Sequence, residues 1–190
     1  MKFLCYNLNM FEEKVELKNK KIVTIGLIAT KDNFIVCAVD ENNKIVGKCV
    51  FEIVTREIKS ISSPKFNGQE KYLIKDKNIL NGNTNSSIVS QEFIKESNLK
   101  IGSNLNICKL NQIEILSEDF FKVGLGSLIV KKMEEFAVSK NCQKISGWFY
   151  PNGNFWYGAS SFYSKNSFDF IKDEKGITHI TKTLEASKEK

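Results

Sequence analysis

Two glycines, Gly124 and Gly126, stand between an apolar run typical of a strand and an amphipathic run typical of a helix. The first N–H groups of a helix have no acceptor inside it, and the helix dipole places positive charge there. Glycine in such a loop lets an anion approach the main chain more closely than a β-carbon would permit. The spacing therefore predicts a binding site for a phosphate-bearing ligand.

Three phosphate-binding signatures compete for this loop. A dinucleotide fingerprint requires a third small residue, where the chain has Ile129, and an acidic residue ending the next strand, where it has Tyr150. A P-loop requires the triplet Gly-Lys-Ser or Gly-Lys-Thr, which this sequence lacks. Both signatures fail, which leaves the third.

The third signature is a coenzyme A loop. The run Gly124-Leu125-Gly126-Ser127, preceded by a strand and followed by a helix, resembles the Arg/Gln-x-x-Gly-x-Gly/Ala motif of the GNAT N-acetyltransferase superfamily. A second block, residues 159–168, is similar to that family's Ala-x-x-aliphatic-Tyr-x-Lys-x-Gly-Phe, with Ser167 in place of Gly. The two blocks occur in the family's order, and the resemblance covers residues 106–184.

The resemblance implies acetyl-CoA as cosubstrate, with no metal. The pantetheine arm would lie where the strand ending near Ile115 separates from the strand Lys-Ile-Ser-Gly-Trp-Phe-Tyr. Phe121 stands where the family has Arg or Gln, so we expect Lys122 to supply the charge for the pyrophosphate. The cofactor-binding residues implied in this way are Ile115, Leu116, Phe121, Lys122, Val123, Gly124, Leu125, Gly126, Ser127, Asn154 and Tyr163.

Tyr163 and Glu114 are the candidates for catalysis. Tyr163 matches the position where the family commonly keeps a tyrosine that protonates the departing thiolate; otherwise it is a packed helix aromatic. A lysine-type amine is neutral in only about one molecule in a thousand at pH 7, so a base helps. Glu114 lies on the strand beside the cofactor and is the best-placed carboxylate for that task, unless it is an ordinary solvated strand residue.

The turn after that strand carries two further carboxylates, Glu118 and Asp119. They either steer a cationic acceptor or only place negative charge before a helix. The aromatic residues of 148–157 are expected mostly in the core, with one or two of 155–157 lining the acceptor pocket.

The charge balance bears on partners. The chain has 28 Lys and Arg residues against 22 Asp and Glu, a net charge of +6, and Arg56 is its single arginine. Because arginine is the usual reader of bases, this composition argues against sequence-specific nucleic-acid binding, while nonspecific attraction of polyanions stays open.

Cysteine and histidine usage bears on metals and location. The five cysteines form no Cys-x-x-Cys pair and are expected as reduced thiols, mostly in the core. His179 is the one histidine of the chain, so a His-rich metal site is excluded. We expect His179 to lie in a strand. Neither the N-terminal run nor the longest apolar stretch fits a signal peptide or a membrane span, so we expect a cytoplasmic protein without membrane attachment.

The resemblance implies an α/β (α+β) fold: a single GNAT-like domain over residues 1–190, with a mixed, mostly antiparallel central sheet flanked by helices. A meander of strands begins at Ile22, Asn33 and Ile45, and residues 59–103 are an insertion of uncertain structure. Residues 105–184 form the acetyl-CoA-binding part. Its expected order is strand 106–116, helix from 125 to Lys140 and Asn141, strand 144–150, helix 155–165 and strands 168–171 and 177–184.

The expected function is transfer of an acetyl group from acetyl-CoA to a primary amine by direct attack. The alternatives are an acetyltransferase that modifies a macromolecule, either a protein or a charged tRNA, and a noncatalytic regulatory module that binds coenzyme A. A homodimer is left open.

Overall fold

The computed structural model describes residues 12–61, 70–91, 95, 102, 104–149, 155–172 and 177–184. The helices with described bounds are the short 3-10 helix η2 (Glu118–Phe120), α2 (Leu125–Ser139) and α3 (Phe155–Lys165). The strands are β1 (Glu12–Glu16), β2 (Ile22–Ala29), β3 (Phe34–Val39), β4 (Ile45–Ile61), β5 (Lys71–Asn78), β6 (Thr84–Ser90), β7 (Asn104–Ile115), β8 (Cys142–Phe149), β9 (Asp169–Lys172) and β10 (Thr178–Thr183).

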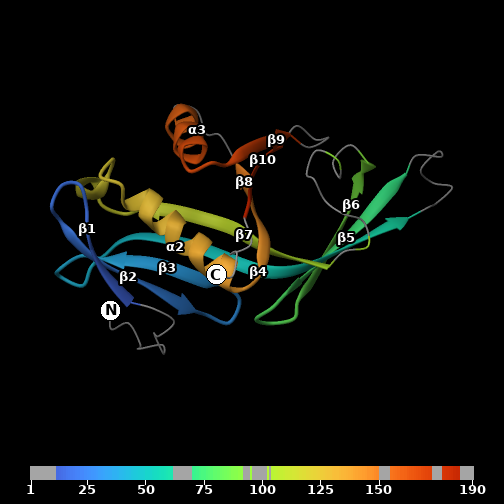
Figure 1. Cartoon of the computed structure of the whole chain (residues 1–190), viewed down its shortest axis with the longest axis horizontal. Coiled ribbons are helices and arrows are strands. Elements are labelled where there is room, and N and C mark those ends of the chain that lie inside the picture. The colour runs from blue at the N-terminus through green and yellow to red at the C-terminus, as the bar shows by residue number, and fades with distance from the viewer. Residues whose placement is uncertain are drawn as a thin grey trace, which may run out of the picture.

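The described strands form one sheet in the order β1-β2-β3-β4-β7-β8-β10-β9, with β5 paired to the far half of β4 and β6 paired to β5 (Figure 1). Every neighbouring pair is antiparallel except β7 and β8. These two are parallel because α2 returns the chain to the same end of the sheet between them. The expected mixed, mostly antiparallel sheet is confirmed.

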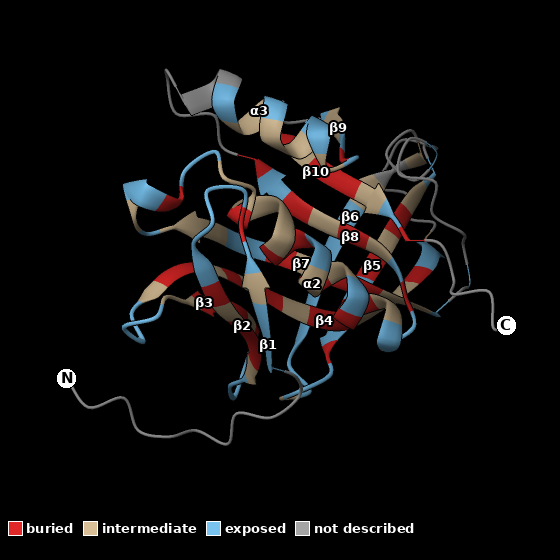
Figure 2. Ribbon diagram, turned by 60° about the vertical axis from the view of Figure 1, so that its left-hand side comes forward, coloured by how far each residue is buried: buried red, intermediate tan, exposed pale blue. Residues whose placement is uncertain are grey.

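The core lies between α2 and the face of the sheet formed by β3, β4, β7 and β8. Side chains alternate along a strand, so every second residue points to this face. Cys49, Phe51 and Ile53 of β4 and Ile129 and Met133 of α2 are each at most 1% exposed. Figure 2 shows the result on β4, where buried and intermediate residues alternate beneath α2.

The predicted end of the long helix is confirmed. Lys140 is the C-terminal cap of α2, and Asn141 has a φ of 56°, in the left-handed region that asparagine tolerates. The predicted meander, the second helix and both terminal strands also form, whereas β1 was not predicted because Glu-Glu-Lys-Val-Glu has almost no apolar signal.

The described part of the expected insertion is a hairpin of the same sheet. β4 continues to Ile61, and β5 and β6 pair beside its far half, so this arm projects away from α2 (Figure 1). The arm has a small core of its own, made by Ile58, Tyr72 and Ile74.

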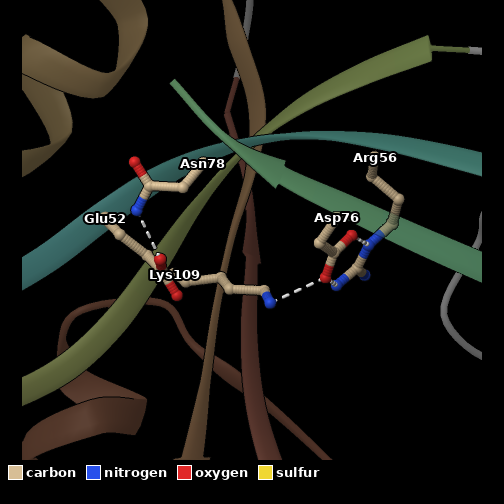
Figure 3. A network of polar contacts seen from close by, with 5 residues as sticks. All are labelled: Glu52, Arg56, Asp76, Asn78 and Lys109. Atoms are coloured by element: carbon tan, nitrogen blue, oxygen red, sulfur yellow. Dashed lines mark hydrogen bonds and ion pairs between the residues drawn. The ribbon is translucent and has the colours of Figure 1, made fainter. Parts of the chain in front are cut away.

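A buried polar network joins this arm to the body of the sheet (Figure 3). Asp76 of β5 accepts hydrogen bonds from Nε and Nη2 of Arg56 at 2.7 and 2.8 Å. Its carboxylate also forms an ion pair with Nζ of Lys109 at 2.7 Å. Burial raises the pKa of Asp76, but the hydrogen bonds and charges of Arg56 and Lys109 outweigh it and lower that pKa below its ordinary value. The single arginine of the chain is therefore committed to a structural ion pair.

Candidate functional site

Strands β7 and β8 pair only over part of their length. Their parallel register ends at Leu110 and Gly147, while β7 continues beside β4 as far as Ile115. The register between β4 and β7 shifts at this point, because Phe51 faces Leu110 and Val50 faces Gln112, which leaves Asn111 as a bulge. A bulge bends its strand and ends pairing, so one edge of β7 leaves β8 beyond Leu110. We call this divergence of β7 from β8 the splay.

The glycine loop lies at the start of α2. Gly124 caps the helix with a φ of 95°, a left-handed conformation, and no side chain caps the helix N-terminus. Lys122, with a φ of 60°, makes the turn with it. The leading N–H groups of α2, from Leu125 to Ser127, thus have no acceptor within the helix, as the anion site requires.

The loop residues differ in exposure. Phe121 is 50% exposed and Lys122 is exposed, with no ion pair to any described residue, whereas Leu125 is fully buried and serves the core. Val123, Gly126 and Ser127 are half-buried. Among the loop residues Lys122 is therefore the one that presents a positive charge with no ion pair to a described residue, and its contact with a pyrophosphate stays a prediction.

Gly126 has a second reason to lack a side chain. A Cβ built at Gly126 would lie 2.9 Å from Cε2 of Phe162 in α3. The sequence analysis explained this glycine by the approach of a phosphate alone. The structure adds a close contact between the two helices.

The two residues expected at the end of β7 point to different uses. Ile115 is half-buried and packs against the core. Leu116 is 49% exposed, and its N–H donates to the carbonyl oxygen of Val46 at 2.8 Å, so this N–H is already engaged. Asn154, also expected to bind the cofactor, lies outside the described residues.

Tyr163 projects from α3 toward the end of β8. Its ring makes edge contacts with Phe149, Phe162 and Phe168 at centroid distances of 5.7, 5.2 and 5.5 Å. Burial raises the pKa of Tyr163 to about 12. The phenol is therefore protonated at every working pH, and its hydroxyl has no hydrogen bond to another described residue.

Glu114 lies on the opposite face of the sheet from Tyr163. Ile113 and Ile115 pack against the core beneath α2, so the alternation of β7 turns Glu114 away from it. Its carboxylate forms an ion pair with Nζ of Lys48 at 3.1 Å and accepts a hydrogen bond from Gln112. The structure thus places the two catalytic candidates on opposite faces of the sheet.

The turn after β7 has a structural role. Glu118 and Asp119 form the first turn of η2, and Asp119 pairs with Nζ of Lys21 at 3.1 Å. Asn19 donates to the carbonyl oxygen of Asp119 at 3.3 Å, so the β1–β2 turn is tied to the turn before the glycine loop. Glu118 has no ion pair to a described residue. Steering of a cationic acceptor by its carboxylate stays a prediction.

The remaining sequence expectations are located as follows. The four described cysteines are buried free thiols, and His179 of β10 lies in a strand with its ring 5.2 Å from that of Trp148. Phe149 is buried, as expected, but Trp148 is 58% exposed on the face opposite α2. Among the described residues no cluster of His, Cys, Asp or Glu is arranged to hold a metal, and no helix is both long and apolar enough to span a membrane.

The bulge was missed at the sequence level, although a signal exists. Core-facing residues of β7 fall on even positions at Cys108 and Leu110 and on odd positions at Ile113 and Ile115. Such a one-residue shift of the apolar period marks an inserted residue.

A hollow of about 660 Å³ lies elsewhere, between the far half of α2 and β10. Its wall contains the ion pair of Lys182 with Glu134, whose atoms lie 2.6 Å apart. It is distant in the fold from the glycine loop and presents paired charges, so we do not place the site there.

Solved structures resemble this architecture. Arabidopsis thaliana NAA60 in complex with a bisubstrate analogue gives a TM-score of 0.50 at 11% identity, over 82% of this chain and 78% of that chain. The same protein in complex with acetyl-CoA gives 0.50 at 10% identity over the same shares. A GNAT-family acetyltransferase from Listeria monocytogenes gives 0.44 at 13% identity over 79% of this chain, which spans only 64% of that one.

No protein-family model matches the chain, and no curated protein matches it. The structural likenesses show that this chain has the fold of the GNAT acetyltransferases.

Proposed function

We propose that this chain, which has the GNAT fold, transfers an acetyl group from acetyl-CoA to a primary amine. The observation that carries the proposal is the splay of β7 and β8 beside the exposed N-terminus of α2. One feature offers a slot for a pantetheine arm and the other an anion site for its pyrophosphate. The NAA60 structures, one with acetyl-CoA and one with a bisubstrate analogue, support this use of the fold.

The diphosphate would sit on the leading N–H groups of α2. The space beside Gly124 is open to the diphosphate, since a Cβ built there would meet nothing within 4 Å. The left-handed φ is what disfavours other residues at this position. Lys122 adds the charge that Phe121 cannot supply, and as a flexible point charge it holds a phosphate less tightly than the fork of an arginine. We infer that the affinity for coenzyme A rests mainly on backbone N–H groups.

The reaction is a single displacement. The neutral amine attacks the thioester carbonyl carbon, a C–N bond forms, the C–S bond breaks, and the thiolate leaves while the nitrogen loses a proton. N–H groups along the unpaired edge of β7 would stabilise the charge that develops on the carbonyl oxygen, a placement commonly worth about 3–4 kcal/mol. The N–H of Leu116 is excluded from this role because it already donates to Val46.

Glu114 is our candidate for receiving the proton of the amine, directly or through water. The ammonium form of the acceptor would compete with Lys48 for this carboxylate, since both are cations and the side chain of Lys48 is 33% exposed. If the acceptor ammonium replaced Lys48 as the partner of Glu114, the amine would lie beside its base. One cation would still face the one carboxylate.

Tyr163 is our candidate for the group that meets the thiolate. Its pKa of about 12 lies above that of an ordinary thiol, about 8.5, so full proton transfer is uphill in the free protein. A thiolate in the same dry site has a raised pKa as well, which narrows the difference. The phenol therefore acts first as a hydrogen-bond donor and completes the transfer as the C–S bond breaks.

An exposed amine of a protein is the second acceptor class. The β1–β2 connection is a tight turn from Leu17 to Lys21, and both α2 and α3 pack on the core face of the sheet. On the other face Ile28, Ile35 and Val50 are only half-buried. Such an open face fits a chain segment better than a small molecule that needs an enclosing pocket.

Calorimetric titration with coenzyme A tests the binding site. Lys122→Glu and Ser127→Glu place negative charge at the loop and are expected to weaken binding at least tenfold. Lys131→Glu is the matched control, because Lys131 is 71% exposed and lies more than one helical turn beyond the loop. Equal affinity in all three variants would remove the loop from the site.

Acetyl-CoA consumption against panels of small amines and peptides then tests catalysis. Turnover with peptides alone favours the protein acceptor, and turnover with small amines favours the first class. Binding of coenzyme A without turnover on either panel would instead support a noncatalytic regulatory module.

A further inference from the structure

Gly126 occupies the first turn of α2, in a conformation that does not require glycine. Among the described glycines only Gly82, Gly102 and Gly124 have a positive φ. Glycine inside a helix is less favourable than alanine, because it loses more backbone freedom on folding. The missing side chain therefore needs a reason other than φ, and close packing supplies one besides the approach of a phosphate.

The close packing is with the ring of Phe162 in α3. A Cβ at Gly126 would lie 2.9 Å from Cε2 and 3.4 Å from Cζ of the ring. Ordinary van der Waals contact begins near 3.4 Å, so an alanine would push the ring away by about 0.5 Å. A phenyl ring cannot bend, and the displacement passes to the backbone of α3 or to a rotation of the side chain.

The residue after Phe162 is Tyr163, and the end of α3 that carries both is held firmly. Asn166 Nδ2 donates to the carbonyl oxygen of Phe162 at 2.8 Å, and the N–H of Phe168 donates to that of Tyr163 at 3.0 Å. The rings of Phe162 and Tyr163 lie 5.2 Å apart at 71°. Because the two residues are adjacent in α3 and their rings are in contact, a shift of Phe162 changes the packing around the ring of Tyr163.

We propose that Gly126 and Phe162 form a positioning contact that seats α3 on the start of α2 and thereby places the hydroxyl of Tyr163 at the end of the splay. Gly126 acts through Tyr163 and is a positioning residue. The catalytic consequence rests on the proposed function, whereas the contact itself does not. The glycine loop thus sets both the anion site and the position of the phenol.

Gly126→Ala is the primary test. Displacing Tyr163 by a fraction of an ångström is expected to lower kcat by about tenfold or more, measured at saturating acetyl-CoA. Loosened packing around Tyr163 should also lower its phenol pKa from about 12 toward the ordinary 10. Ultraviolet titration measures that pKa, with Tyr163→Phe used to assign the signal among the tyrosines.

Phe162→Leu tests whether the effect of Gly126→Ala passes through the ring, because leucine lacks the ring atoms that meet the new Cβ. In the Phe162→Leu background, Gly126→Ala should have little further effect on kcat. If the single variant does not fold, Phe162→Leu alone decides: it introduces no clash and should still lower the phenol pKa by opening the aromatic cluster.

Weaker coenzyme A binding by Gly126→Ala with an unchanged phenol pKa would overturn the proposal and leave the glycine to the phosphates. An unchanged phenol pKa in both Gly126→Ala and Phe162→Leu would also overturn it. If the wild-type chain binds no coenzyme A, the proposed function fails, but the phenol titration still judges the contact.

Discussion

Replacing Asp76 by Asn removes the charge at the centre of the buried network and keeps its shape. Breaking a buried ion pair by removing one partner costs about 3–5 kcal/mol, because the remaining charges lose their compensation. We expect the lower end, about 3 kcal/mol. The side chains of Arg56 and Lys109 are 13% and 22% exposed and can still reach water, and the amide oxygen still accepts one hydrogen bond.

The assay is urea unfolding, with thermal unfolding as a second measure. For a chain of 190 residues, about 3 kcal/mol corresponds to a fall in Tm of about 6–12 °C. Glu57→Gln is the matched control. Glu57 is the β4 neighbour of Arg56 and pairs with Lys59 at 2.7 Å, but the two side chains are 39% and 57% exposed, so its loss should cost less than about 1 kcal/mol.

The pH dependence supplies a second check. The pKa of Asp76 is lowered in the folded state, so its contribution is present above the unfolded pKa, about 3.9, and is lost as pH falls through the folded value. The difference between wild type and Asp76→Asn should stay constant from about pH 5 to 8 and shrink below about pH 4. Equal stability of Asp76→Asn and Glu57→Gln at pH 7 would refute the account of the network.

Four further predictions concern the proposed site and the core. Tyr163→Phe should lower kcat on the order of a hundredfold with KM for acetyl-CoA nearly unchanged, measured where chemistry limits the rate; normal turnover would remove Tyr163 from the mechanism. Gly147→Ala should destabilise the fold by about 1–3 kcal/mol in urea unfolding, because its Cβ would lie 2.9 Å from the carbonyl oxygen of Leu110. A Cβ at Gly158 would meet nothing within 4 Å, so Gly158→Ala should stabilise α3 by about 0.5–1 kcal/mol. Equal changes in the free energy of unfolding for Gly147→Ala and Gly158→Ala would contradict the packing argument. Burial raises the pKa of Cys142 to about 12, so iodoacetamide should modify this thiol only in urea, as mass spectrometry of the labelled peptides would check; rapid native labelling would count against its burial.

The sequence alone determined the elements around the glycine loop, because each has a local signal. The apolar face of α2 recurs at helical spacing, and its end was readable from Lys140 and Asn141, which tolerate the required backbone conformations. Gly124 was likewise predicted to lie between a strand and the start of this helix, and the structure adds its left-handed φ of 95°. Such features depend on residues within one or two turns of each other, so no distant part of the chain is needed to predict them.

The tertiary structure alone decided how these elements meet. The contact of Gly126 with Phe162, the ion pair of Glu114 with Lys48 and the burial that raises the pKa of Tyr163 all join segments far apart in sequence. Sequence spacing carries no information on which distant side chains approach within a few ångströms.

The fate of residues 59–103 shows the same limit. Their polar runs offered weak periodicity, and only pairing with the far half of β4 reveals the described part as a hairpin. Strand pairing is a long-range choice whose favourable terms come from the partner strand, so the segment read alone could not disclose it. The motifs that suggest the proposed chemistry lie within short stretches of the sequence, but the geometry of the proposed site was set by contacts that form only when the sheet assembles.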